Sequence, residues 1–288
     1  MTSTSTEEAA RNLFKGCAPE RGDEIEAFFK DLQLRFNITE DTDNNGNATP
    51  VIEAGCYTLV RFNHRTMRLF WLAAYIAWEA YCAVSKTDEQ RVSLLNTDRF
   101  KILLQAFEDT KNASNVDSIS LPCGIPDPGV YPPSDTNPQE RAVAELATFA
   151  VGWAFLHEIY HIKCQQSGAS SSDKNDEKKR KEELACDEYA TKFLLEKVGC
   201  YARENNVNEL DVMRKRRWGI YFAFFAMTLL TKDNWQETST HPSMQARIDE
   251  LQRCLDRKDP DIADAASYTS FIVLKEIYAN SPHLKFNS

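Results

Sequence analysis

The stretch RAVAELATFAVGWAFLHEIYHIK, from Arg141 to Lys163, is apolar on most sides when it is drawn as an α-helix. Asn137 and Pro138 lie just before it, and a capping residue followed by proline at the first helical position is typical of a helix start. A helix that is apolar on most sides is a buried one. We therefore expect a mainly α fold with a small β component, in which this buried helix is central.

Two of the chain's five histidines, His157 and His161, lie on this helix, and Glu158 directly follows the first. Residues four apart on a helix point the same way, so the two imidazoles are placed to bind one Zn²⁺ at about 2.0–2.1 Å. Glu158 lies about 60° around the helix axis from His161, which suits a general base rather than a third ligand. The alternative is a core helix with two hydrogen-bonded histidines, but burying such groups without partners costs roughly several kcal/mol.

The third zinc ligand is predicted to be a carboxylate on a later helix. No histidine follows soon after His161, and a catalytic zinc has three protein ligands and one open position. The segment EELACDEYA offers Glu183 and Asp187, which are four apart and share a helix face. We predict Glu183 as the ligand and Asp187 as the acceptor that orients a ligand imidazole. Glu182 remains the competing ligand, and an exposed acidic helix start is the non-functional alternative.

A third segment, STHPSMQARIDEL, begins at Ser239 and places His241 before a proline that is suited to open a helix. His241 is predicted to donate a hydrogen bond to the oxyanion of peptide hydrolysis, or to occupy the open zinc position in a resting form. Arg247 is predicted to pair with Asp187 or with the substrate. The alternative for His241 is a surface histidine at a helix entry.

The order HEIYH, EELACDEYA and THPSMQARIDEL is similar to that of gluzincin metallopeptidases of the HtpX-like type. Two features depart from that pattern: those proteins have clear membrane-spanning helices, and Cys186 stands where alanine is usual. Over about residues 137–251 the chain better resembles the Lit-type phage-exclusion peptidases. That resemblance implies a zincin-like helical core and a zinc endopeptidase that cleaves elongation factor Tu when a phage capsid peptide is present. It also implies zinc ligands at His157, His161 and Glu183, a base at Glu158, and supporting roles for Asp187, His241 and Arg247.

Composition and net charge limit the classes of partner and the cellular compartment that we expect for this protein. The chain has 288 residues and a net charge of −9, with acidic and basic residues interspersed, which argues against a nucleic-acid partner. None of its eight cysteines forms a C-x-x-C pair, and the N-terminus lacks the features of a signal peptide, so a reducing cytosol is expected. The apolar runs 67–84 and 218–231 are too charged or too short to predict a membrane span. Peripheral membrane contact remains open.

Five prolines between residues 122 and 133 forbid regular structure and mark a predicted boundary. Residues 1–136 are expected to form an N-terminal lobe that binds substrate or a partner, and residues 137–288 the helical metallopeptidase lobe. The alternatives to a peptidase of the Lit type are a regulatory peptidase that cleaves a repressor and a non-catalytic zinc-bound sensor or interaction module. Further helices are expected at about 22–33, 65–84, 97–112, 178–199, 207–231, 242–257 and 261–279, with a strand at 56–62.

Overall fold

The structure is a computed structural model that describes residues 3–37, 41–42, 48–55, 57–85, 96–170, 175–232, 234–255 and 261–285. Within these ranges the chain is mainly helical with a small β component, which confirms the predicted fold class. The helices are α1 (Ser3–Cys17), α2 (Gly22–Asp31), α3 (His64–Ser85), α4 (Asp98–Asn112), α5 (Pro138–Ser167), α6 (Asp176–Leu195), α7 (Val198–Asn205), α8 (Glu209–Leu230), α9 (Met244–Leu255) and α10 (Ile262–Ile277). The strands are β1 (Arg35–Asn37), β2 (Asp41–Thr42), β3 (Ala48–Thr49), β4 (Ile52–Ala54) and β5 (Leu59–Phe62).

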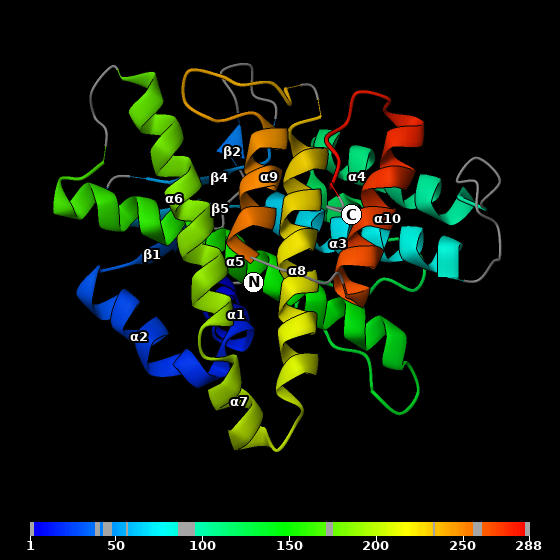
Figure 1. The fold of residues 1–288 in the computed structure, drawn as a ribbon, viewed down its shortest axis with the longest axis horizontal. Coiled ribbons are helices and arrows are strands. Elements are labelled where there is room, and N and C mark those ends of the chain that lie inside the picture. Colours follow the sequence, from blue (N-terminus) through cyan, green and yellow to red (C-terminus); the bar gives the residue numbers. More distant parts are fainter. Residues whose placement is uncertain are drawn as a thin grey trace.

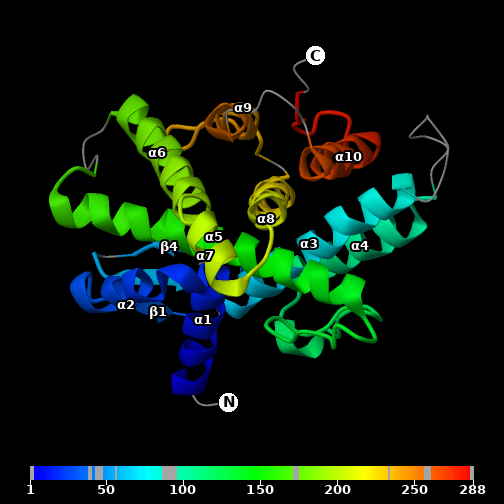
Figure 2. The ribbon, with the colours of Figure 1, turned by 60° about the horizontal axis from the view of Figure 1, so that its bottom comes forward.

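Helix α5 is the central element, as its apolar sequence predicts. Helices α6, α8 and α9 lie on one side of it, and α1, α2 and the small sheet lie on the other (Figures 1 and 2). It contacts α8, α6, α3, α1 and strands β4 and β5. Because neighbours cover it from several directions, His157 and Glu158 are buried together with the apolar residues that surround them.

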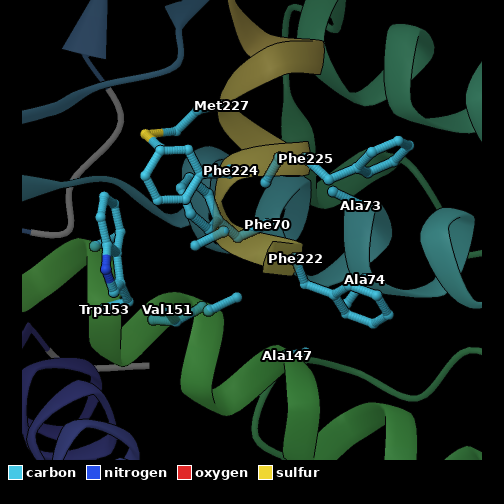
Figure 3. Packing of buried hydrophobic residues seen from close by; sticks show 14 of the residues in the cluster. Phe70, Ala73, Ala74, Ala147, Val151, Trp153, Phe222, Phe224, Phe225 and Met227 are labelled. Carbon is cyan, nitrogen blue, oxygen red and sulfur yellow. The ribbon is translucent and has the colours of Figure 1, made fainter. Parts of the chain in front are cut away.

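The core is built where α3, α5 and α8 cross. Aromatic side chains of α8, including Phe222 and Phe224, pack against small residues of α3 and α5 (Figure 3). The approach between α5 and α8 is close because α8 carries a glycine at the crossing. A Cβ atom on Gly219 would lie 2.4 Å from the Cβ atom of Phe149 and 3.1 Å from the backbone oxygen of Leu146.

The small sheet has the strand order β1-β5-β4, with β1 parallel and β4 antiparallel to β5. The predicted strand at 56–62 starts later, at Leu59; Cys56 lies outside the described residues. The strand cannot begin at Tyr57, because this residue has a φ of +54° and an extended strand needs a negative φ. Its N–H donates to Gln165 Oε1 at 2.9 Å and its carbonyl accepts from Gln166 Nε2 at 2.6 Å. The end of α5 therefore holds the turn that leads into β5.

Two differences from the sequence prediction concern helices. The single helix expected at 178–199 is divided into α6 and α7. Two arginines bind the backbone at the division: Arg21 donates to the carbonyl of Phe193 at 2.8 Å, and Arg216 donates to that of Leu194 at 2.7 Å. Helix α1 was not predicted at all. It is stabilised by packing on α5, where the rings of Phe14 and Phe155 meet edge to face.

The stretch 120–137 is largely irregular, as its prolines predict. One buried apolar cluster nevertheless contains side chains from both sides of it, including Phe14 and Phe62 before it and Phe155 after it. The division into lobes at residues 136 and 137 stays a prediction.

Among the described helices, α5 alone is long and apolar enough to cross a bilayer, judged by length and composition. However, 83% of its most apolar window is buried inside the structure. A buried core helix of a soluble protein has this property.

We predict that Gly219→Ala lowers the free energy of unfolding by about 1–3 kcal/mol, because the added methyl group overpacks the contact with Phe149. The measurement is urea unfolding followed by far-UV circular dichroism. Gly22→Ala is the matched control, since nothing lies within 4 Å of the added Cβ and its φ is −50°. It should be neutral or stabilise by up to about 1 kcal/mol. Equal effects of the two substitutions would contradict the close approach of α5 and α8.

Candidate metal centre

Helices α5 and α6 lie side by side in an antiparallel arrangement that brings the predicted segments together. Three pairs of residues, each one helical turn from the next, link them. Trp153 Nε1 donates to Thr191 Oγ1 at 3.1 Å, His157 Nδ1 lies 2.9 Å from Asp187 Oδ1, and His161 Nε2 lies 3.2 Å from Glu183 Oε1. This regular pairing fixes which face of α6 is presented to the two histidines.

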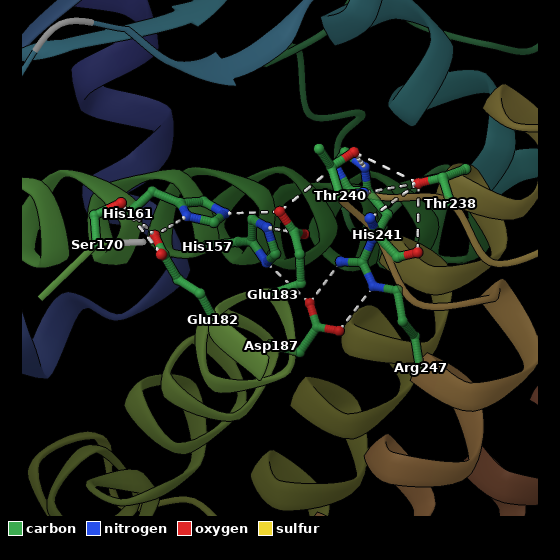
Figure 4. A network of polar contacts seen from close by, with 10 residues as sticks. All are labelled: His157, His161, Ser170, Glu182, Glu183, Asp187, Thr238, Thr240, His241 and Arg247. Carbon is green, nitrogen blue, oxygen red and sulfur yellow. Dashed lines mark hydrogen bonds and ion pairs between the residues drawn. The ribbon is translucent and has the colours of Figure 1, made fainter. Parts of the chain in front are cut away.

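The Glu183 carboxylate is the hub of the site (Figure 4). Its Oε2 lies 3.4 Å from His157 Nε2, and its Oε1 lies 3.2 Å from His161 Nε2 and 3.5 Å from His241 Nε2. One carboxylate therefore faces the Nε2 atoms of three imidazoles that come from two separate segments. His157 and Glu183 are buried, with 6% and 8% of their surface exposed.

The other ring nitrogens of the α5 histidines face separate carboxylates. His157 Nδ1 is next to Asp187, although the contact is poorly aligned for a hydrogen bond. His161 Nδ1 lies 2.9 Å from Glu182 Oε1. Asp187 in turn accepts two hydrogen bonds from Arg247, at 2.8 and 2.6 Å. Both imidazoles thus have one nitrogen directed at Glu183 and one directed at an outer acid.

The charges in this cluster shift the pKa values of its members. Burial alone lowers the pKa of His157, but the carboxylates of Asp187 and Glu183 outweigh it, so the pKa is raised. The pKa of His161 is raised as well, because Cys186, Glu182 and Glu183 together outweigh burial. Burial opposes ionisation of Glu183, yet the two imidazoles hold its pKa well below the usual range. Carboxylate charge is therefore retained inside the protein and demands positive partners.

Glu158 lies apart from this network but is equally buried, with 6% of its surface exposed. Burial raises the pKa of its carboxyl group, and the imidazoles of His157 and His161 oppose that rise more strongly than the Ala54 backbone of strand β4 does. A carboxyl group with a raised pKa is a better proton acceptor than a free one. Glu158 is therefore a buried proton acceptor next to the sheet and the two histidines.

His241 lies on the segment between α8 and α9, and its side chain is 56% exposed. Its Nδ1 lies 2.7 Å from Thr240 Oγ1, and its backbone N–H donates to Thr238 Oγ1 at 2.9 Å. Arg180 of α6 donates to the Thr238 carbonyl at 3.2 Å and so joins this segment to α6. His241 is thereby held against Glu183 while it remains accessible from solvent.

Cys186 belongs to the cluster, although the sequence did not mark it as functional. It is fully buried, and its Sγ atom lies within 4.8 Å of a ring nitrogen of both His157 and His161. Its neighbour Glu182, which was considered only as a competing ligand, pairs with His161 Nδ1 instead. The three- and four-residue spacing of the acids and Cys186 on one helix is the signal that would have found them. Thr240 was also missed by the sequence prediction. Its position next to His241 is the only feature of the sequence that points to it.

The donor set fits a divalent cation. Two imidazoles and a carboxylate from two helices converge, and this combination of nitrogen and oxygen donors is typical of Zn²⁺ sites. The net charge points the same way when the two imidazoles are neutral, as metal ligands are, because the acids then outnumber Arg247, their buried cationic partner. Those acids are Glu158, Glu182, Glu183 and Asp187.

Fold and site together define a mainly helical protein with a buried histidine–carboxylate centre of the H-E-x-x-H type. A protein-family model described as Peptidase U49 matches residues 60–267, well over half of the chain, and the chain belongs to this family. It is therefore a peptidase, a hydrolase that acts on protein or peptide substrates. No curated protein and no solved structure matches the chain significantly.

We predict that Arg247→Ala lowers the free energy of unfolding by about 3–5 kcal/mol, because it leaves Asp187 buried without its cationic partner. The control is Arg253→Ala on the same helix, which removes an ion pair to Glu250 whose arginine side chain is 69% exposed. That loss should stay below about 1 kcal/mol. Chemical denaturation of both variants measures the difference, and an Arg247→Ala variant as stable as the Arg253→Ala control would be inconsistent with the buried pair.

Proposed function

We propose that this peptidase is a zinc-dependent endopeptidase in which His157, His161 and Glu183 hold the ion. The observation that carries the proposal is the placement of the Glu183 carboxylate against the Nε2 atoms of both imidazoles. The outer acids Asp187 and Glu182 face the Nδ1 atoms, which is the arrangement that fixes the tautomer and orientation of metal-ligating histidines.

When bound, zinc supplies Lewis-acid polarisation of the substrate carbonyl and lowers the pKa of water to about 7. The chain's own residues carry the proton transfers. Glu158 accepts a proton from the attacking water and delivers it to the leaving amine, and its raised pKa suits both steps. The Ala54 backbone lies close to the Glu158 carboxylate on the side of the sheet.

His241 stabilises the oxyanion in this proposal. A Thr240 hydroxyl that donates to His241 Nδ1 leaves the proton on Nε2, the nitrogen that faces the centre. Nε2 is then a hydrogen-bond donor directed at the position where negative charge develops. Its exposed position on a segment outside α5 and α6 leaves room for a polypeptide to approach.

The substrate is proposed from the resemblance to the Lit-type peptidases. It is elongation factor Tu in phage exclusion, with a phage capsid peptide as activator, and a repressor is the alternative target. The proposed location is the cytoplasm, which agrees with the absence of disulfides among the cysteines of the described residues. Incubation with cell lysate, with and without a chelator, followed by N-terminal mapping of new fragments, identifies the target. Fragments that form equally with the chelator would count against metal-dependent cleavage.

We predict that Glu158→Gln keeps its metal and lowers turnover by about 10²- to 10⁴-fold, because the base is lost while the ligands remain. His157→Ala should lose both metal and activity. The measurements are elemental analysis of the purified proteins and cleavage of fluorescein-labelled casein. Glu177→Gln is the control, since Glu177 lies on α6 with its side chain 69% exposed. Wild-type turnover in Glu158→Gln would remove the proposed base.

The rival function, a non-catalytic zinc-bound module, is favoured by the short distance between His241 and Glu183, because a permanent fourth ligand would close the site. We predict that His241→Phe keeps its metal and lowers turnover by about 10²- to 10³-fold, as loss of an oxyanion donor does. His64→Phe is the control, because His64 pairs with Asp117 outside this cluster. Loss of metal in His241→Phe, with no cleavage by the wild type, would favour the rival.

A further inference from the structure

Cys186 occupies a position in the centre that packing alone does not require. It lies three residues after Glu183 on the face of α6 that meets α5, and none of its surface is exposed. Its thiol lies close enough to the His161 imidazole to raise the pKa of that ring. One ring nitrogen of His157 and one of His161 lie within 4.8 Å of the Cys186 Sγ atom and of each other.

Cys17 shows what a buried packing cysteine looks like in the same protein. It is equally buried, but its side chain fills the space over Gly152, where a Cβ atom would lie 2.5 Å from the sulfur. It belongs to the buried apolar cluster of the fold, whereas Cys186 does not. Both cysteines are buried, so burial does not distinguish them. The difference is that two imidazoles lie next to Cys186.

We propose that Cys186 Sγ is a direct ligand of the ion held by His157 and His161, an inference that rests on the proposed zinc function. Thiolate sulfur and imidazole nitrogen together are a frequent Zn²⁺ donor set. On binding, the thiol proton is released to solvent and the sulfur–metal bond forms; when the sulfur leaves, it takes a proton back. No oxidant or reductant takes part.

A sulfur ligand changes what the centre can do. With Glu183 also bound, four protein ligands fill the tetrahedral coordination of zinc, and closed sites of this kind are structural rather than catalytic. The sulfur-bound form is therefore a resting state, and substrate gains access only when Cys186 leaves. An alanine at residue 186 would hold the site permanently open, at the expense of metal affinity.

X-ray absorption at the zinc edge tests the ligand directly, using the full-length protein purified with its metal. We expect a sulfur scatterer at about 2.3 Å in the wild type, and only nitrogen and oxygen at about 2.0–2.2 Å in Cys186→Ala. The Co²⁺-substituted proteins should show a thiolate-to-cobalt charge-transfer band that Cys186→Ala lacks. Cys254→Ala is the matched control, because it removes a half-buried thiol on α9 and should keep both signals.

Metal affinity and activity complete the test. Zinc affinity of Cys186→Ala should fall by about tenfold or more, while cleavage of labelled casein by the zinc-saturated variant should exceed that of the wild type, because the resting form is lost. Far-UV circular dichroism establishes that the variant is folded, and Cys186→Ser serves as a second variant if it is not. A wild-type centre with no sulfur scatterer overturns the proposal, and equal or reduced cleavage by the saturated variant overturns the resting state.

The two proposals fail in different ways. Stoichiometric zinc with no sulfur signal and normal cleavage removes Cys186 as a ligand and leaves the endopeptidase intact. A protein that binds no metal at all removes the zinc function, and the inference about Cys186 with it.

Discussion

The register between α5 and α6 is the constraint on which the centre depends. Glu183 faces two imidazoles because the two helices are antiparallel and their contacts repeat once per turn, from Trp153 and Thr191 at one end to His161 and Glu183 at the other. A slip of one residue would rotate the Glu183 side chain by about 100° around α6 and carry it away from both imidazoles. The contact between α5 and α6 therefore builds both the core and the site. A change in the packing of these helices also changes the geometry of the site.

The parts of the fold that were predictable are those whose signal is local. The sequence predicts helix α5 from Asn137, from Pro138 and from the apolar stretch that follows. The four-residue spacing of its two histidines predicts that they share one face of the helix. The choice between Glu182 and Glu183 was not settled by the sequence, although Glu183 was predicted as the ligand, because the two acids are adjacent on α6. Their roles are separated only by the rotation of α6 on α5, which places Glu182 against His161 Nδ1 and Glu183 against the Nε2 atoms. That rotation is a tertiary property.

The N-terminal segment illustrates what sequence periodicity omits. Strand β1 pairs in parallel with β5 across more than twenty residues. Phe36 stacks on Phe155 and Phe14 meets it edge to face, and Phe155 lies two residues before His157. No local pattern reports such long-range contacts. The family match begins at residue 60, yet Ala54 reaches Glu158 from the strand next to β5. A residue outside the matched range thus lies next to the buried carboxyl group of Glu158.

In the proposed zinc centre, the buried charges couple metal binding to protonation. The imidazoles of His157 and His161 have raised pKa values because carboxylates surround them, so protons and a divalent cation compete for the same nitrogen atoms. Uptake of the cation must displace those protons, and its affinity must therefore rise with pH until the imidazoles are neutral. The carboxylates stay buried when the imidazoles lose their protons, because Arg247 and the helix contacts hold them in place. Either protons or a cation has to balance Glu183 and Asp187, and the exchange between the two is inherent in the packing of α5 on α6.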